Sequence, residues 1–192
     1  MTLKINQPVL ATLIEDGASS SDITAASNVA AKVESHSVKR LTFTLTDLVV
    51  NVAEADDYGG TKIADLPDRN LLILAVEIDL SVSKGLTTNG IIDTTDVSLA
   101  LGTTAPSATP LAGSAINFSD TQSFTATEET IAYQFNNNDI ADGDPGAVPG
   151  KFADSATRAI WLNAAASITA DDTLTANGTI TVVYVDCLNG IS

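Results

Sequence analysis

The side chains best suited to catalysis in this sequence are one histidine, His36, and one cysteine, Cys187. A Ser-His-Asp site needs an imidazole base beside a nucleophile, and a zinc site needs several nitrogen or sulfur ligands at close spacing. No G-x-S-x-G motif marks a nucleophile, and His36 and Cys187 lie far apart in the chain. We therefore predict no catalytic triad, no zinc centre and, with a single cysteine, no intrachain disulfide. His36 is interpreted as an exposed histidine of a turn or of the N-terminal arm, and Cys187 as a small apolar filler.

Adjacent carboxylates are a second possible source of chemistry. They occur at Asp56-Asp57, Glu128-Glu129 and Asp171-Asp172. A glycosidase needs two carboxyl groups across a cleft, usually with aromatic side chains that hold the sugar rings. The chain has one Trp and three Tyr, mostly at strand-like positions. We therefore predict no glycosidase site at these pairs and expect that the protein is not an enzyme.

The loop NNNDIADGDPG, from Asn136 to Asp144 and beyond, carries the oxygen ligands that calcium prefers. Its spacing departs from the EF-hand pattern. With Gly143 at the sixth position, Ile140 and Pro149 fall where ligand oxygens are required. A polar loop built from turn residues is the favoured interpretation, and calcium at Asn136–Asp144 is kept as the alternative. No phosphate-binding G-x-x-x-x-G-K-[ST] motif is present, so no cofactor is predicted.

The net charge of the chain excludes some classes of binding partner. The 192 residues carry a formal net charge of -15, and no Lys or Arg occurs between Gly85 and Gly150. Such a chain repels nucleic-acid phosphates and anionic membrane surfaces, so we predict no direct nucleic-acid partner and no membrane partner. The first residues, MTLKINQPVLATLIEDG, lack the unbroken apolar run of a signal peptide, which predicts synthesis in a cytoplasm.

The elements that would position any site are mostly strands, because apolar residues recur at every second position. From Leu74 to Val82 the even-numbered residues are apolar and alternate with Glu77, Asp79 and Ser81. The predicted core residues of this strand and of the strand near the end are Leu74, Val76, Ile78, Leu80, Ile180, Val182 and Tyr184. The same alternation occurs in LTFTLT, DVSLALG, TIAYQF and AIWL.

Three local signals add detail. The segment from Asp22 to Glu34, DITAASNVAAKVE, is the best helix candidate, with Asp22 as its cap. The Asn177-Gly178 pair predicts a hairpin turn. Segments 103–125 and 136–156 are predicted to be long loops, the first with a short helical turn near Asn117 to Thr121.

Frequent strands, few helices and long loops of unequal length predict an all-β fold. We expect an antiparallel β-sandwich of the jelly-roll type with long loops. Residues 1–40 are predicted to form an N-terminal arm or edge strand, and residues 41–192 a single β-sandwich domain. The low charge of segment 103–118 makes it a candidate contact with another subunit or a partner.

A pattern of turns and strands then resembles a known family. It comprises YGGTKIADLPDRNLLILAVEIDLSV, the central DVSLALGT and the late AIWLNAAASITADDTLTANGTITVVYV. Together these segments resemble the head decoration, or capsid cement, proteins of tailed bacteriophages, over roughly Leu41 to Asp186. The N-terminal 40 residues fall outside the pattern.

The resemblance implies a structural virion protein that decorates and stabilises the outer surface of the capsid. It implies a homotrimer, the major capsid protein as partner and, for localisation, the virion after synthesis in the bacterial host. Because each copy carries a net charge of -15, we expect association to strengthen as salt screens the repulsion. The alternative is an adhesin-like or carbohydrate-binding sandwich, with calcium in the Asn136–Asp144 loop.

Overall fold

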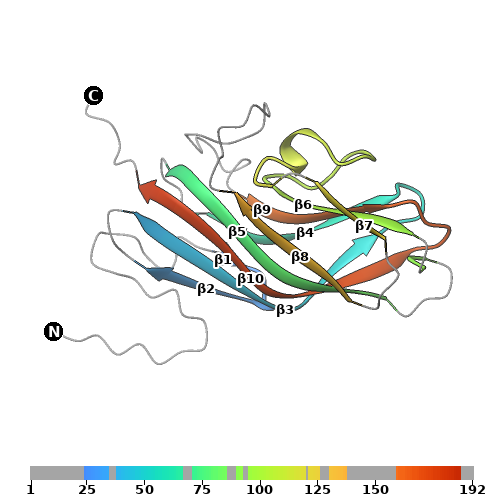
Figure 1. Ribbon diagram of the computed structural model, residues 1–192, viewed down its shortest axis with the longest axis horizontal. Coiled ribbons are helices and arrows are strands. Elements are labelled where there is room, and N and C mark those ends of the chain that lie inside the picture. Colours follow the sequence, from blue (N-terminus) through green and yellow to red (C-terminus); the bar gives the residue numbers. More distant parts are fainter. Residues whose placement is uncertain are drawn as a thin grey trace.

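The computed structural model shows two five-stranded antiparallel sheets packed face to face (Figure 1). It describes residues 24–34, 38–66, 71–85, 90–92, 95–119, 121–125, 130–137 and 159–186. Within these ranges the regular structure is almost entirely strand, with one short 3-10 turn and no α-helix. The predicted all-β antiparallel sandwich is therefore confirmed.

The first sheet has the strand order β1-β4-β9-β6-β7. Its strands are β1 (Thr24–Ala25), β4 (Tyr58–Asp65), β9 (Ala159–Ala166), β6 (Asp96–Gly102) and β7 (Gln122–Thr125). The second sheet has the order β2-β3-β10-β5-β8. Its strands are β2 (Val29–Glu34), β3 (Lys39–Val52), β10 (Asp172–Asp186), β5 (Leu71–Lys84) and β8 (Thr130–Asn137).

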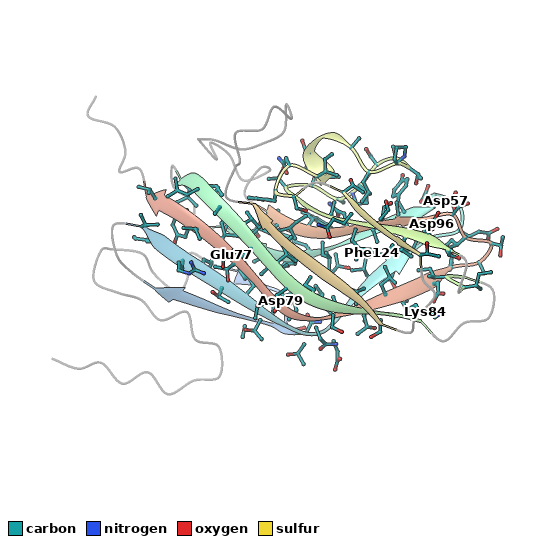
Figure 2. All side chains as sticks on the ribbon, in the orientation of Figure 1. Asp57, Glu77, Asp79, Lys84, Asp96 and Phe124 are labelled. Atoms are coloured by element: carbon teal, nitrogen blue, oxygen red, sulfur yellow. The ribbon has the colours of Figure 1, made fainter. Side chains whose placement is uncertain are left out.

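The core lies between the sheets and is filled by the inward side of each alternating strand. Phe43 and Tyr184 are among its largest buried side chains. The predicted core residues Val76, Ile78, Leu80, Ile180, Val182 and Tyr184 are all buried. Glu77 and Asp79 lie on the outer side of β5 (Figure 2). The predicted register from Val76 onward is therefore confirmed, and each large aliphatic side chain contributes about 1.5–3 kcal/mol by its burial.

Leu74 departs from the prediction, because it is exposed at 36%. Val183 of β10 pairs with Ala75 and Tyr184 with Ile73, so Leu74 is an extra residue on β5. This β-bulge changes which side of the strand each residue faces: Leu71 and Ile73 are buried before it, and Val76 after it. The prediction that Leu74 belongs to the core was wrong because a continuous period of two was assumed across the bulge.

A second bulge explains why the hairpin prediction at Asn177-Gly178 was also wrong. Both residues lie inside β10, where Ala176 pairs with Leu48 and Gly178 with Leu45 of β3. The side chain of Asn177 accepts a hydrogen bond from the Asp47 backbone N–H at 2.8 Å and donates one to its carboxylate at 3.2 Å. Gly178 has a φ of 129° at this irregularity. An Asn-Gly pair that typically forms a turn here supports a bulge within a long strand.

Replacement of Gly178 by alanine is expected to lower the free energy of unfolding by about 1–3 kcal/mol. A side chain would be forced into a backbone conformation it rarely adopts, with its Cβ 2.2 Å from the Asp79 carbonyl oxygen. The measurement is urea unfolding, with Thr179→Ala in the same strand as the control. Equal midpoints for the two variants would contradict the assignment of a strained bulge.

The helix predicted from Asp22 to Glu34 is also wrong. The described residues of this segment form β1 and β2, joined by a turn at residues 26–28. β2 pairs along β3, with Val29 opposite Leu45, and β1 pairs with the end of β4. Pairing with an adjacent long strand outweighs weak local helix preference. Residues 24–34 thus supply one edge strand to each sheet, while the division at residue 40 stays a prediction.

Candidate interaction surface

Segment 103–119, here called the cover loop, packs on the outer face of the first sheet. It follows β6, contains the 3-10 turn η2 (Gly113–Ala115) and lies beside β6 and β9 in Figure 1. Leu111 of the cover loop forms a small apolar cluster with Ala100 of β6 and Ala165 of β9. The predicted long loop at 103–125 is therefore confirmed for most of its length. The helical turn lies earlier than predicted, and residues 122–125 form β7.

Asn163 of β9 ties two parts of the cover loop to the sheet. Its side chain is fully buried, and its Nδ2 donates hydrogen bonds to the carbonyl oxygens of Thr104 at 3.0 Å and Ala115 at 2.8 Å. Both donors of the amide are thus used, one near each end of the loop. The Oδ1 atom is buried and has no hydrogen-bond partner. The buried Ala115 carbonyl and the partly buried Thr104 carbonyl therefore receive hydrogen bonds from this one side chain.

The base of the cover loop is closed by further hydrogen bonds. The Thr103 N–H donates to Ser114 O at 2.8 Å and to Asn117 Oδ1 at 2.9 Å, and the Asn117 amide donates back to Thr103 Oγ1 at 3.0 Å. At Gly102, an added Cβ would lie 2.3 Å from the backbone of Ala115, so only glycine permits this approach.

The far side of the cover loop is held as well, because Thr109 Oγ1 donates to Asp57 O at 3.1 Å. These bonds, with those of Asn163, fix the cover loop near its two ends and at Thr109. A loop already held in one conformation loses little conformational entropy when it binds a partner.

The outward surface of the cover loop carries no charge. Between Asp96 and Asp120 the sequence contains no charged residue, although the chain as a whole has a net charge of -15. The exposed residues of the loop are Thr104, Ala105, Ser107, Ala108, Thr109, Pro110, Ala112, Gly113 and Ser114. The centres of protein interfaces are depleted in charged residues. The combination of a fixed conformation and an uncharged surface makes the cover loop the candidate interaction surface.

Most residues singled out for possible chemistry lie outside the described ranges. These are His36, Cys187, Glu128-Glu129 and residues 138–144 of the Asn136–Asp144 loop. Asn136 and Asn137 form the end of β8, so the predicted loop at 136–156 begins later than expected. Among the described residues, no group of His, Cys, Asp or Glu is arranged to hold a metal ion. Because residues 138–144 lie outside the described ranges, calcium binding by the Asn136–Asp144 loop stays a prediction.

The other carboxylate pairs lie in the turn after β3 and at the start of β10, where they accept backbone hydrogen bonds. Asp57 Oδ1 accepts from Ile168 N at 3.0 Å, and Asp171 Oδ1 accepts from Glu54 N at 2.8 Å. The buried Asp172 accepts from Ile91 N at 2.7 Å. The first two bonds join the turn after β3 to the turn before β10, and the third joins the start of β10 to residues 90–92. These bonds give the carboxylates a structural role.

Asn163 was missed in the sequence, although a signal for it exists. In AIWLNAAA, the strand β9, Asn163 is the one polar residue in an apolar run. Asparagine is seldom fully buried unless its amide is hydrogen-bonded. An isolated asparagine in such a strand therefore indicates that backbone from elsewhere packs on that face.

No protein-family model matches the chain, and no curated protein matches it. Within the described ranges, no helix has the length and apolar character needed to cross a membrane.

Proposed function

We propose that this protein is a structural component of a tailed-bacteriophage virion. In this role it decorates the outer surface of the capsid as a homotrimer and stabilises the shell by binding the major capsid protein. The cover loop is the observation that carries the proposal, because it offers an uncharged surface in a fixed conformation on an otherwise acidic protein. The sequence pattern from Leu41 to Asp186 supports the same role.

The strand order is consistent with the jelly-roll part of the proposal. Without the two edge strands β1 and β2, the sheets have the orders β3-β10-β5-β8 and β4-β9-β6-β7. Successive strands therefore alternate between the sheets, except that β6 and β7 are neighbours in one sheet. Such alternation supports two interlocked Greek keys, the arrangement of jelly rolls in viral capsid and lectin domains.

Stabilisation of a shell requires a rigid protein more than a reactive one. A protein that contacts neighbouring shell subunits adds its own binding free energy to the work of separating them. The extensive core and the fixed cover loop suit that task, because a flexible protein would deform without resisting separation of the shell subunits. The proposal includes no catalytic or metal role, no direct nucleic-acid partner and no membrane partner.

The substitution Ala108→Asp is expected to weaken binding to undecorated capsids at least about tenfold. Ala108 is exposed on the cover loop, and burial of an unpaired carboxylate in the contact is costly. Binding is measured by co-sedimentation of the purified full-length protein with undecorated capsids of the phage that encodes it.

The matched control is Ala30→Asp, which makes the same chemical change at an exposed position of β2. It is expected to bind capsids like the unchanged protein. Failure of the unchanged protein to bind capsids would overturn the proposed function. Equal binding by Ala108→Asp and the unchanged protein would show that the cover loop is not part of the contact with the capsid.

A further inference from the structure

The Asn177-Gly178 pair of β10 combines a reactive sequence with access to solvent. In an asparagine–glycine pair, the glycine backbone nitrogen can attack the side-chain carbonyl carbon of the asparagine, because glycine has no side chain to obstruct the approach. The asparagine then loses its amide as ammonia, a reaction known as deamidation. Asn177 and Gly178 are only half-buried. Burial therefore does not protect this amide, and any protection must come from its geometry.

The Asn177 amide is held by Asp47 of β3. Its Oδ1 accepts a hydrogen bond from the Asp47 backbone N–H at 2.8 Å, and its Nδ2 donates one to the Asp47 carboxylate at 3.2 Å. Asp47 is itself held, because its carbonyl oxygen accepts a hydrogen bond from Asn28 Nδ2 at 3.2 Å. These bonds direct the amide across to β3 rather than along its own strand. Rotation of the amide toward the Gly178 nitrogen would break both of its bonds to Asp47.

The backbone of the pair is held against β5 on the other side. Closure of a ring between Asn177 and Gly178 requires rotation about the Asn177 Cα–C bond, away from the extended backbone of a strand. Asn177 pairs with Ser81 of β5, and a Cβ added to Gly178 would lie 2.2 Å from the Asp79 carbonyl oxygen. The β5 backbone therefore leaves no room for that rotation while the strands stay paired.

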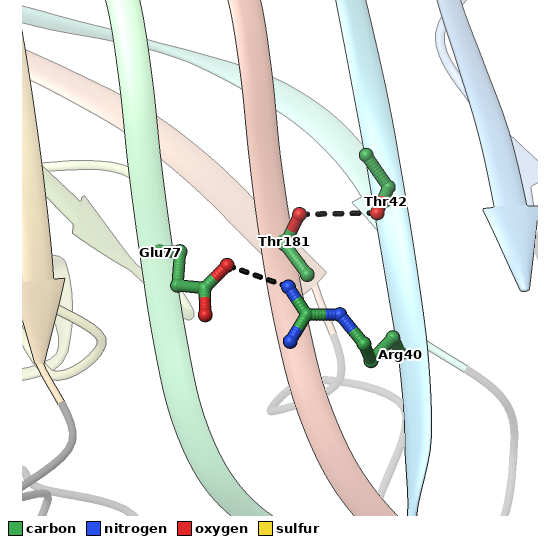
Figure 3. Close-up of polar contacts among 4 residues, drawn as sticks. All are labelled: Arg40, Thr42, Glu77 and Thr181. Carbon is green, nitrogen blue, oxygen red and sulfur yellow. Dashed lines mark hydrogen bonds and ion pairs between the residues drawn. The ribbon is translucent and has the colours of Figure 1, made fainter. Parts of the chain in front are cut away.

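Side-chain contacts next to the bulge also join β10 to its neighbours. Thr181 of β10 shares a hydrogen bond of 3.0 Å with Thr42 of β3 (Figure 3). Arg40 of β3 forms an ion pair of 2.7 Å with Glu77 of β5 across β10. Ring closure therefore requires β10 to separate locally from both neighbouring strands.

We propose that Asn177 is a deamidation site that the folded protein protects, and that a chain which opens at this bulge is converted to a product that no longer fits there. In the open chain, the Gly178 nitrogen gives its proton to solvent hydroxide and forms a bond to Asn177 Cγ. The side-chain nitrogen leaves as ammonia, so a succinimide ring is formed. Water then adds to either carbonyl of the ring and gives aspartate or isoaspartate.

Neither product restores the contacts of the bulge. Aspartate at position 177 has no N–H to donate to Asp47 Oδ1, and it places a second carboxylate beside that of Asp47. Isoaspartate adds a carbon atom to the backbone of β10, a strand that is paired on both sides. A chain that deamidates while open is therefore lost from the native population. This inference goes beyond the proposed function and does not depend on it.

The test compares the full-length protein at mildly alkaline pH in buffer and in guanidinium chloride, with mass spectrometry of the peptide that carries Asn177. Deamidation of Asn177 is expected to be at least about tenfold slower in buffer than in denaturant. Asn189, which also precedes a glycine, shows that the reaction proceeds in denaturant. Equal rates at Asn177 in the two solutions would overturn the proposal.

Asp47→Gly tests the contribution of the Asp47 carboxylate. Asp47 has a φ of 50°, which glycine adopts readily, so the variant loses the carboxylate but keeps the backbone N–H. It is expected to raise the rate at Asn177 in buffer about threefold, as loss of one hydrogen bond predicts. Val97→Ala, in the core beside the first sheet, is the control for lost stability and should leave that rate unchanged. Equal rates in the two variants would contradict protection by Asp47.

Refolding tests the second part of the proposal. After removal of the denaturant, chains deamidated at Asn177 are expected to be depleted from the native fraction, compared with chains deamidated only at Asn189. Circular dichroism and gel filtration identify the native fraction. Recovery of both kinds of chain in the same proportion would show that the deamidated products still fit the bulge, which would overturn this part.

Discussion

Replacement of Ile78 by alanine is expected to lower the free energy of unfolding by about 2–5 kcal/mol. Ile78 is 3% exposed in the main core, and it lies on β5 opposite Ile180 of β10. β5 is itself held between β10 and β8, so the backbone around the site has little freedom to collapse into the space left by the lost atoms. The cavity term therefore adds to the loss of buried apolar surface.

Thermal and urea unfolding of the full-length protein provide the measurement. Ser81→Ala, at an exposed position of the same strand, serves as the control and is expected to change stability by less than about 0.5 kcal/mol. If Ile78→Ala were as stable as the control, the assignment of β5 to the centre of the second sheet would be wrong.

The second large effect is expected at Asn163. Asn163→Ala removes both donors from the carbonyl oxygens of Thr104 and Ala115. A buried carbonyl left without a donor costs about 1–3 kcal/mol, and the loss at the partly buried Thr104 carbonyl adds less, so we expect a total destabilisation of about 2–4 kcal/mol. Asn163→Asp is expected to be at least as harmful, because a carboxylate oxygen would then face a carbonyl oxygen in a buried site.

Amide hydrogen exchange can show whether the Asn163 side chain holds the cover loop on the sheet or only contributes to packing. In Asn163→Ala, the backbone amides of Thr103 and Phe118, which are hydrogen-bonded at the base of the loop, are expected to exchange with solvent faster. Asn51→Ala, at an exposed position of β3, is the control and should leave that exchange unchanged. Unchanged exchange at Thr103 and Phe118 in the Asn163 variant would show that the loop is held by its other contacts.

The parts of the fold that were predictable follow from one physical rule. A strand with one buried face must alternate apolar and polar residues, and Val76 to Val82 does so without interruption. Ile160 and Leu162 are likewise buried, with Trp161 on the other face. Where the alternation is regular, the prediction of the buried side was correct.

The bulges and the cover-loop contacts were harder to predict, because they depend on residues distant in sequence. In β3 the buried residues change from odd to even numbers between Leu45 and Leu48, and this shift is visible in LTFTLTDLVVNV. The partner that accommodates it, Asn177, lies in β10. The two carbonyl partners of Asn163 likewise lie far from it in sequence. Spacing along the chain carries no information about such pairs.

The central place of β10 has a consequence for synthesis on the ribosome. β10 follows every other described strand in sequence, yet it lies between β3 and β5 and pairs with both along most of their length. β3 can pair earlier with β2, and β5 with β8, but each lacks its central neighbour until β10 (Asp172–Asp186) has left the exit tunnel. The nascent chain must therefore carry β3 and β5 with unpaired edges while the intervening residues are translated. Such delayed, long-range pairing is slow and exposes intermediates to aggregation, so folding during synthesis is expected to benefit from chaperones that shield nascent chains.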